Sequence, residues 1–215
     1  MASKYVMPSV ALASGGAGAA GVGGYIALTK DKETFRSQYS KAILGEKDSL
    51  WDTKFEALKG NGTPVNKKLL DAKSKHSSDA NAAKALHKQG CSEIYNSLVA
   101  ESTYLEDFKS YCAKTIKDGI SKPETWISAG DTQNDGKLDT KLTSLKDHDE
   151  EKLGSLDETL KALKNKLTSG STSSWDADKR NELKNWCKGI GGEIFEGEES
   201  VKFSHAKLYC TDNAG

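Results

Sequence analysis

The sequence predicts a mainly α-helical protein, in which an N-terminal Gly/Ala-rich membrane segment precedes two tandem homologous helical units with one disulfide each. Helices are expected because 29% of the 215 residues are charged, only three are proline, and β-branched runs are few. An uncharged opening predicts the membrane segment, and an ordered set of repeated residues predicts the two units. The expected boundaries are 1–31 for the membrane segment, 32–118 for the first unit and 119–215 for the second.

The opening segment, residues 5–29, has no charged side chain and is followed at once by the charged residues 30–33. An apolar stretch of about 20 residues can cross a bilayer as a helix. Because this one is mostly glycine and alanine, we expect only marginal insertion. A cleaved signal peptide is the alternative, since residues 11–13 and 17–19 both fit a small-x-small cleavage site. We favour an uncleaved signal anchor because the apolar run before the first of these sites is short.

Residues 16–21 also match GxGxxG, the phosphate-binding fingerprint of dinucleotide-binding folds. That fingerprint needs a βαβ unit and a buried parallel sheet, which would require Val/Ile runs downstream that the sequence lacks. We therefore interpret these glycines as part of the membrane segment, and we expect no cofactor.

The remainder of the chain has the pattern of a tandem duplication. Trp51–Lys59 matches Leu138–Lys146, and both segments contain Asp, Thr, Lys, Leu and Lys at the same places. Further matches follow in the same order: Glu33–Phe35 with Glu124–Trp126, Asp79 and Leu86 with Asp176 and Leu183, Cys91 with Cys187, and Tyr111–Cys112 with Tyr209–Cys210. The shared residues are mostly apolar, aromatic or cysteine, so the repeat indicates a scaffold rather than a shared chemistry.

Within the first unit, Asp79 is expected to cap an Ala-rich helix that continues through Leu86, and residues 61–64 (NGTP) are expected to form a turn. In the second unit, leucines spaced three and four apart predict an amphipathic helix that ends in the Ser/Gly-rich residues 169–174. These leucines are Leu153, Leu156, Leu160, Leu163 and Leu167.

The next helix is expected to begin at Ser173 or Ser174, with Asp176 in its first turn, and to run to about Trp186 or Cys187, where Gly189 stops it. The tail 191–210 contains glycine and scattered aromatic residues, and this composition predicts a loop or short extended pieces.

Four cysteines occur as one pair in each unit, which predicts the disulfides Cys91–Cys112 and Cys187–Cys210. Each bond would close a loop of roughly 20 residues and contribute roughly 3 kcal/mol. A zinc site would instead require CxxC or Cys/His spacing, which is absent, and free buried thiols are the alternative if the domain is cytoplasmic.

The charges that flank the apolar segment disagree with the cysteines about orientation. Lys30, Lys32 and Arg36 follow the segment and only Lys4 precedes it, which favours a cytoplasmic C-terminal part. Disulfides form in oxidising compartments, which favours an extracellular C-terminal part. We give the cysteines more weight and predict a protein of the cell membrane whose soluble part is extracellular.

Three further patterns resemble sites but have simpler explanations. Residues 131–136 resemble the start of a calcium loop, but Leu142 stands where a bidentate Glu is needed, so we interpret them as a polar turn. The charge run 147–151 is interpreted as a solvated helix face on which Asp147 and Glu151 lie together. The histidines are dispersed and no GxSxG or HExxH accompanies them, so we expect no catalytic and no metal-ligating residues.

The charge balance limits the classes of partner. The 31 Lys and Arg residues equal the 31 Asp and Glu residues in number, so the formal net charge is zero. A neutral chain has no general attraction for nucleic acid, and its lysines do not form a strip with aromatic residues. We expect no nucleic-acid partner, and the oligomeric state stays open.

The two ends of the chain resemble a known family. The opening Met1–Lys4 leads into a Gly/Ala membrane segment and a long polar helical part. The ending contains Trp186–Cys187, Phe195, Gly197–Glu198, Phe203 and Tyr209–Cys210. In these features the chain resembles a paralogous family of uncharacterised surface proteins from hemotropic mycoplasmas. The resemblance implies a surface protein with a role in antigenic variation, and it supplies no catalytic residues.

These observations together predict a membrane-anchored, non-enzymatic surface antigen or adhesin-like module. Its expected partners are the membrane, through the N-terminal segment, and a host surface macromolecule. A surface hydrolase of unrecognised type is the alternative. A concave pocket in which histidine and carboxylates converge would favour the hydrolase, and a solvated helical surface would favour the antigen.

Overall fold

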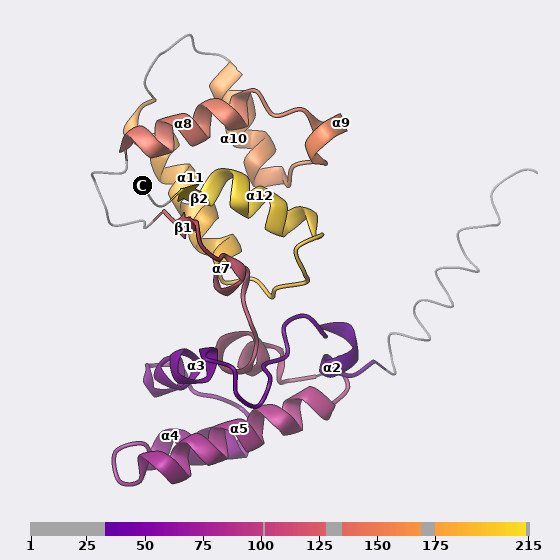
Figure 1. Ribbon diagram of the computed structural model, residues 1–215, viewed down its shortest axis with the longest axis vertical. Coiled ribbons are helices and arrows are strands. Elements are labelled where there is room, and N and C mark those ends of the chain that lie inside the picture. The colour runs from indigo at the N-terminus through magenta and orange to yellow at the C-terminus, as the bar shows by residue number, and fades with distance from the viewer. Residues whose placement is uncertain (1–32, 101, 128–134, 169–174, 214–215) are drawn as a thin grey trace, which may run out of the picture.

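The computed structural model describes residues 33–100, 102–127, 135–168 and 175–213, and these residues are mainly α-helical, as predicted (Figure 1). The expected membrane segment at 5–29 lies outside the described residues. Within the described ranges, no helix is both long and apolar enough to span a membrane.

The structure has a lower and an upper helical lobe in the view of Figure 1. The helices up to the connection between the lobes are α2 (Phe35–Gln38), α3 (Leu50–Lys59), α4 (Lys67–Lys75), α5 (Ala80–Asn96), α6 (Leu105–Asp107), the π-helical turn η1 (Phe108–Cys112) and α7 (Ile116–Gly119). The elements that follow are β1 (Glu124–Trp126), α8 (Asp135–Lys146), α9 (Glu150–Leu153), α10 (Glu158–Thr168), α11 (Ala177–Gly191), α12 (Val201–Cys210) and β2 (Thr211–Asn213).

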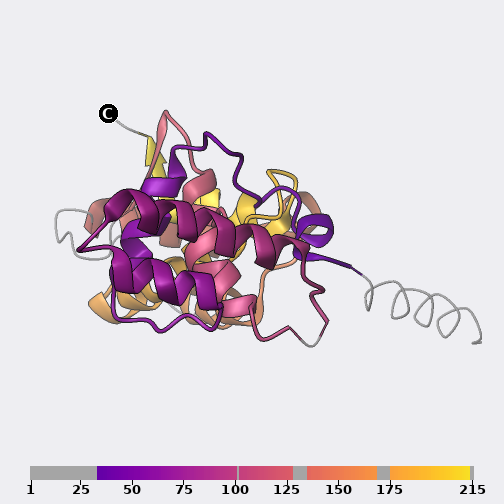
Figure 2. The same ribbon diagram turned by 90° about the horizontal axis from the view of Figure 1, so that it is seen from below.

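The lower lobe is built on α4 and α5, which pack side by side along their length (Figure 2). Helix α3 and the turn η1 pack against them and close a core that includes Phe35, Leu58, Leu69, Ile94 and Phe108, all fully buried. Asp79 caps α5 by accepting a hydrogen bond from the Ala82 amide, as predicted. The helix continues beyond Leu86 as far as Asn96, so that it can carry Cys91 to the core.

The upper lobe packs α8, α10, α11 and α12 around a second core. Strands β1 and β2 form a two-stranded antiparallel sheet in which Trp126 lies opposite Thr211. This sheet places the segment that enters the lobe beside the segment that leaves it. The core residues Leu138, Leu142, Leu145, Leu160 and Leu163 are at most 1% exposed.

The two lobes meet through α7 and the segment after α11. Backbone hydrogen bonds join Ile116 N to Glu193 O at 2.8 Å and Phe195 N to Lys114 O at 3.0 Å. A small apolar cluster of Ile116, Phe195, Phe203 and Ala206 lies at this junction. Because these contacts involve residues on both sides of position 119, the predicted unit boundary lies within a packed region, and the division into two units stays a prediction.

An ion pair reinforces the junction from the lower lobe. The Lys54 ammonium of α3 donates to the Asp118 carboxylate of α7 at 2.7 Å, and the Lys54 side chain is only 7% exposed. Burial raises the pKa of the Asp118 carboxyl group, but the hydrogen bonds from Lys54 and Thr115 outweigh burial, so the pKa lies below its ordinary value. Asp118 is therefore charged at neutral pH and holds α7 against α3.

The sequence predicted one helix for the leucine stripe of the second unit, but in the structure these leucines do not lie on a single helix. The stripe is divided at Gly154, whose φ of +84° favours glycine and ends α9 after Leu153. The next helix, α10, begins at Glu158, and the Asp157 carboxylate accepts a hydrogen bond from the Leu160 amide. Leu153 is consequently 39% exposed, outside the core that the other leucines form.

The predicted bounds of the following helix were wrong at both ends. Helix α11 begins after Asp176, which itself caps the helix by accepting a hydrogen bond from the Lys179 amide. It continues past Gly189 to Gly191, because nothing at Gly189 breaks the hydrogen-bonded ladder. The predicted start residues Ser173 and Ser174 lie outside the described residues.

The tail also differs from the prediction of loop or extended structure. Ser200 caps α12 through a hydrogen bond from the Phe203 amide, and the helix continues to Cys210. The buried side of this helix is formed by Phe203, Ala206 and Tyr209 at spacings of three, which the sequence analysis did not recognise as a helical period.

Candidate functional site

Both predicted disulfides are present in the structure. Cys91 on α5 is bonded to Cys112 in η1 with a Cα–Cα distance of 5.3 Å, and Cys187 on α11 is bonded to Cys210 on α12 at 5.5 Å. Both distances lie within the range that a disulfide allows. All four cysteines of the sequence are therefore paired, each within its own half of the chain.

The surroundings of the two disulfides correspond in detail. Lys84 lies seven residues before Cys91, and its ammonium group lies 2.6 Å from the Asp52 carboxylate of α3. Arg180 lies seven residues before Cys187, and it binds Asp139 of α8 at 2.7 Å. The matched carboxylates Asp52 and Asp139 thus bind cations at equivalent positions of α5 and α11.

Two parts of the sequence alignment do not correspond in this way. Counting from the first cysteine of each pair, the buried Leu183 is equivalent to His87 and not to its neighbour Leu86. The sequence alignment also matched Phe35 with Trp126. Trp126 pairs with the residue that follows Cys210, but the residue that pairs with Ala113, which follows Cys112, is Ile43. The duplication itself stays a prediction, with the register shifted at these two places.

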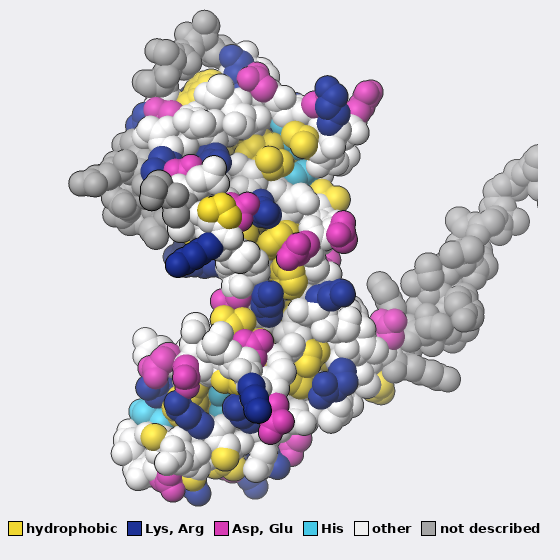
Figure 3. Space-filling view, viewed as in Figure 1, with side chains coloured by type: hydrophobic (Ala, Val, Ile, Leu, Met, Phe, Trp, Pro, Cys, Tyr) yellow, Lys and Arg dark blue, Asp and Glu magenta, His cyan; other side chains and the backbone are white. Residues whose placement is uncertain are grey.

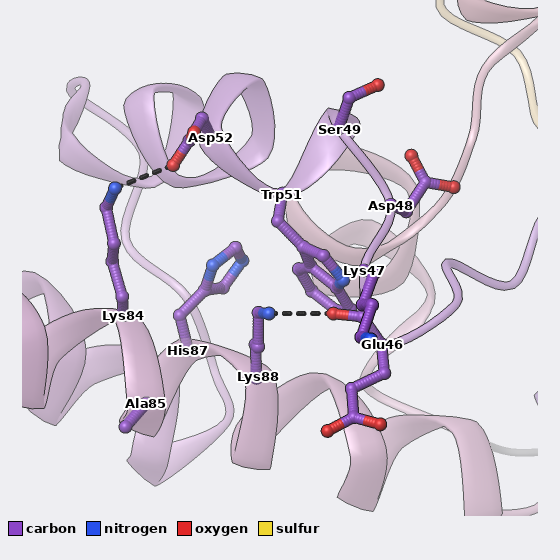
Figure 4. Close-up of a pocket in the computed structure, with 10 residues that line it drawn as sticks. All are labelled: Glu46, Lys47, Asp48, Ser49, Trp51, Asp52, Lys84, Ala85, His87 and Lys88. Atoms are coloured by element: carbon purple, nitrogen blue, oxygen red, sulfur yellow. Dashed lines mark hydrogen bonds and ion pairs between the residues drawn. The ribbon is translucent and has the colours of Figure 1, made fainter.

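A groove lies between α3, α5 and the loop that precedes α3; we call it the α3–α5 groove (Figure 4). Its volume is about 560 Å³. Figure 4 shows His87 at the centre of the groove, between the lysines of α5 and Trp51. The lining residues are Glu46, Lys47, Asp48, Ser49, Trp51, Asp52, Lys84, Ala85, His87 and Lys88.

His87 is held by the backbone that the disulfide fixes. Its Nε2 lies 2.8 Å from the Tyr111 carbonyl oxygen and therefore carries the proton that it donates, which leaves Nδ1 as the acceptor. Burial lowers the pKa of His87, because a charged imidazolium would be poorly solvated at 1% exposure. The ring packs edge-on against Trp51 with the ring centroids 5.5 Å apart. The imidazole is therefore neutral and fixed in orientation at neutral pH.

The carboxylates of the groove bind other groups. Asp52 accepts a hydrogen bond from Lys84, which lowers the pKa of its carboxyl group, and Asp48 accepts one from the Leu50 amide at 2.9 Å. Ser49 points away from His87 (Figure 4). The carboxylates of Glu46 and Asp48 also point away from His87 in Figure 4, and the residues drawn there form no nucleophile–base pair.

The upper lobe contains a buried cluster that the sequence analysis missed. His148 Nδ1 accepts a hydrogen bond from the Tyr209 hydroxyl at 2.6 Å, and its Nε2 donates to the Gly154 carbonyl at 2.8 Å. The His205 ring lies 5.2 Å from the His148 ring, and its Nε2 donates to the Leu153 carbonyl at 3.0 Å. The three side chains join the α8–α9 connection, the end of α9 and α12, and both histidines are nearly fully buried.

The charge run 147–151 is therefore not one solvated helix face. His148 is 4% exposed, and Asp149 caps the short helix α9 by accepting a hydrogen bond from the Glu151 amide. The helix is interrupted between α8 and α9 at this point, and the His148 side chain turns into the core. Burial raises the pKa of Tyr209 to about 12, so the hydroxyl keeps its proton for His148.

A metal site is not formed by the described parts of the chain, where no three His, Cys, Asp or Glu side chains are grouped to hold an ion. The start of the calcium-like segment, 131–134, lies outside the described residues. Leu142, the residue at the place of the bidentate ligand, is fully buried in the upper core.

In comparisons with known proteins, the chain matches no family model, no curated protein and no solved structure.

Proposed function

We propose that the protein is a membrane-anchored, non-enzymatic surface antigen or adhesin-like module whose helical part lies outside the cell. The observation that carries this proposal is the pairing of all four cysteines within the two halves of the chain. Stable structural disulfides belong to oxidising compartments, since cytosolic thiols are kept reduced. The uncharged segment 5–29 supplies the expected anchor.

The surface supports a role in display or adhesion. On the face drawn in Figure 3, basic and acidic side chains are interspersed over both lobes, and apolar patches are small. The residues that the two halves share lie mainly in the cores, as Leu58 and Leu145 do at 0% exposure. The exposed helix faces are thus free to vary without loss of the fold, as a variable antigen requires. The resemblance to the surface proteins of hemotropic mycoplasmas implies the same role.

Protease treatment of intact cells tests the location. We expect external protease to remove the helical part, detected by an antibody against α10 and α11, while a cytosolic marker protein survives. Degradation only after lysis would contradict the proposal.

A surface hydrolase is the second candidate, because His87, Asp48 and Asp52 line the same α3–α5 groove. Its test is a panel of ester, glycoside and peptide substrates. Hydrolysis that disappears in His87→Gln, with thermal unfolding unchanged, would favour this candidate over the first.

A further inference from the structure

Each lobe has a groove beside its disulfide-bearing helix, and the two grooves are equivalent. The first, the α2–α5 groove, has a volume of about 510 Å³ and borders the α3–α5 groove, with which it shares Glu46, Trp51 and Lys88. The second, the α7–α11 groove, has a volume of about 360 Å³ and lies between the connecting helix, β1 and α11.

The walls of the two grooves come from the same positions of the repeat. Lys88 and Lys184 each lie three residues before the first cysteine of their half, and each lines its groove. The opposite wall is Ile43 in the lower lobe and Trp126 in the upper lobe. These two residues pair with the positions that directly follow Cys112 and Cys210. Each groove is therefore lined by a lysine and by a β-paired residue that occupy equivalent positions of the repeat.

Each groove has an aromatic ring, but the ring is supplied by the β1 wall in the upper lobe and by the α5 wall in the lower lobe. Tyr95 and Gly191 both lie four residues after the first cysteine. In the upper lobe, a Cβ atom on Gly191 would lie 2.8 Å from the Trp126 ring, so the missing side chain makes room for the indole. In the lower lobe, Tyr95 supplies an aromatic ring at the position of Gly191, and the groove is also lined by Trp51 and by the smaller Ile43. The grooves thus keep an aromatic floor although the residue that supplies it has changed.

Cations of both grooves retain donors for a ligand. In the α2–α5 groove, Lys88 Nζ donates to the Glu46 carbonyl at 2.9 Å and Arg36 Nε donates to Asn96 at 3.3 Å. An ammonium and a guanidinium each have more N–H groups than these bonds use. In the α7–α11 groove, Lys117 and Lys188 are exposed and form no ion pair with the described residues. No Asp or Glu is among the described residues that line this second groove.

We propose that the two grooves are paired binding sites for acidic sugars of an extended anionic polysaccharide, with one carboxylate or sulfate group held by the cations of each groove. The inference rests on the proposed surface location, where such polysaccharides are met. Ser40 and Ser92 line the first groove together with its cations, and their hydroxyl groups can bond sugar hydroxyls.

The burial of Tyr95 argues against a nucleic acid in the first groove. Single-stranded nucleic acids bind through bases stacked on exposed ring faces. Tyr95 is only 3% exposed, so its ring can form an apolar floor but cannot take a stacked base. The cations lie in two separate grooves of a chain with zero net charge, which is unlike the continuous basic strip that tracks a nucleic-acid backbone.

The test measures binding to the purified full chain in detergent, with both disulfides intact. The probes are octasaccharides of heparin and of hyaluronan, which separate sulfate from carboxylate recognition. Neutral maltooctaose and a single-stranded DNA of matched charge are the comparison ligands. We expect binding of at least one acidic octasaccharide, little binding of the neutral one, and weaker binding of the DNA.

Double variants then assign the binding to the grooves. We expect Lys117→Ala with Lys188→Ala, and Arg36→Ala with Lys88→Ala, each to weaken binding by about tenfold, as the loss of charge-assisted hydrogen bonds predicts. The control is Lys67→Ala with Lys75→Ala, which removes the same charge from exposed positions of α4. Its affinity should stay within about twofold of the parent. Thermal unfolding of each variant verifies the fold.

Absence of acidic-sugar binding would overturn the inference, as would equal weakening by the α4 control or a preference for DNA. These outcomes leave the proposed surface location standing, because intact-cell proteolysis tests that location separately. Proteolysis that placed the protein inside the cell would refute the proposed function even if the purified chain bound heparin.

Discussion

Arg180 on α11 and Asp139 on α8 form a bidentate ion pair, in which Arg180 Nε and Nη2 each lie 2.7 Å from one carboxylate oxygen. Lys84 and Asp52 form the corresponding single-point pair between α5 and α3. In both lobes the pair joins the helix that carries the first cysteine to the helix of the matched segment Trp51–Lys59 or Leu138–Lys146. This correspondence supports the predicted duplication more directly than any of the sequence matches, since it relates positions that are distant in the chain.

We expect Asp139→Asn to lower the free energy of unfolding by about 1–2 kcal/mol, because both partners are less than one-fifth exposed and bonded at two points. Asp52→Asn should have no measurable effect, because the Asp52 side chain is 78% exposed and its pair is screened by water. Urea unfolding of both variants measures the difference. Equal effects would show that burial and geometry do not distinguish the two pairs.

Tyr209→Phe should destabilise the protein by about 1–3 kcal/mol, because it leaves buried His148 Nδ1 without its hydrogen-bond donor. Tyr111→Phe is the matched control, since Tyr111 also precedes the second cysteine of its half and its hydroxyl donates to no described residue. Thermal unfolding should show a lower midpoint for Tyr209→Phe alone. A similar loss in both variants would mean that the hydroxyl–imidazole bond contributes nothing specific.

The stability of the protein should fall as the pH is lowered through about 6.5 towards 5. Burial lowers the pKa of both His87 and His205, so the unfolded chain takes up protons in this range before the folded chain does. The stabilising contribution is thus complete above the unfolded pKa and is lost below it. Carboxylates with a lowered pKa, such as Asp118, act only below about pH 4.

Urea unfolding at a series of pH values measures this dependence. Substitution of both histidines by glutamine should flatten the curve between about pH 7 and 5. An unchanged slope in that variant would assign the dependence to other groups.

Gly191→Ala should destabilise the protein by about 1–3 kcal/mol, because the new Cβ atom would lie 2.8 Å from the Trp126 ring. Gly189→Ala is the matched control in the same helix, where the added Cβ atom meets nothing within 4 Å. That variant should be neutral or more stable by about 0.4–1 kcal/mol, since alanine restricts the unfolded chain. Calorimetry should show a lower midpoint for Gly191→Ala and an unchanged or higher midpoint for Gly189→Ala, and a loss in both would contradict the packing described for Trp126.

The helical class and the disulfides could be predicted because they depend on local composition and on cysteine order. Asp79 could be recognised as a cap from its place before an Ala-rich run. The leucine stripe could not reveal its own interruption, because Gly154 interrupts it through backbone conformation and not through a change of hydrophobic period.

Most contacts of the candidate site could not be predicted from the sequence. His87 is separated from Tyr111 by 24 residues and His148 from Tyr209 by 61, so only the folded chain reveals these contacts. One signal was available: the repeat register counted from the cysteines, which aligns Lys84 with Arg180 and Lys88 with Lys184. Counting from Asp79 and Asp176 instead shifted the alignment by one residue and hid both pairs.

Peptide mapping of the protein from cells that are alkylated before lysis tests the central claim most directly, namely an oxidised, extracellular pair of disulfide-bonded halves. The account predicts two disulfide-linked peptide pairs, Cys91 with Cys112 and Cys187 with Cys210, and no alkylated cysteine. Four alkylated thiols, or a bond between the halves such as Cys91 with Cys187, would contradict it and would remove the main reason for placing the protein outside the cell.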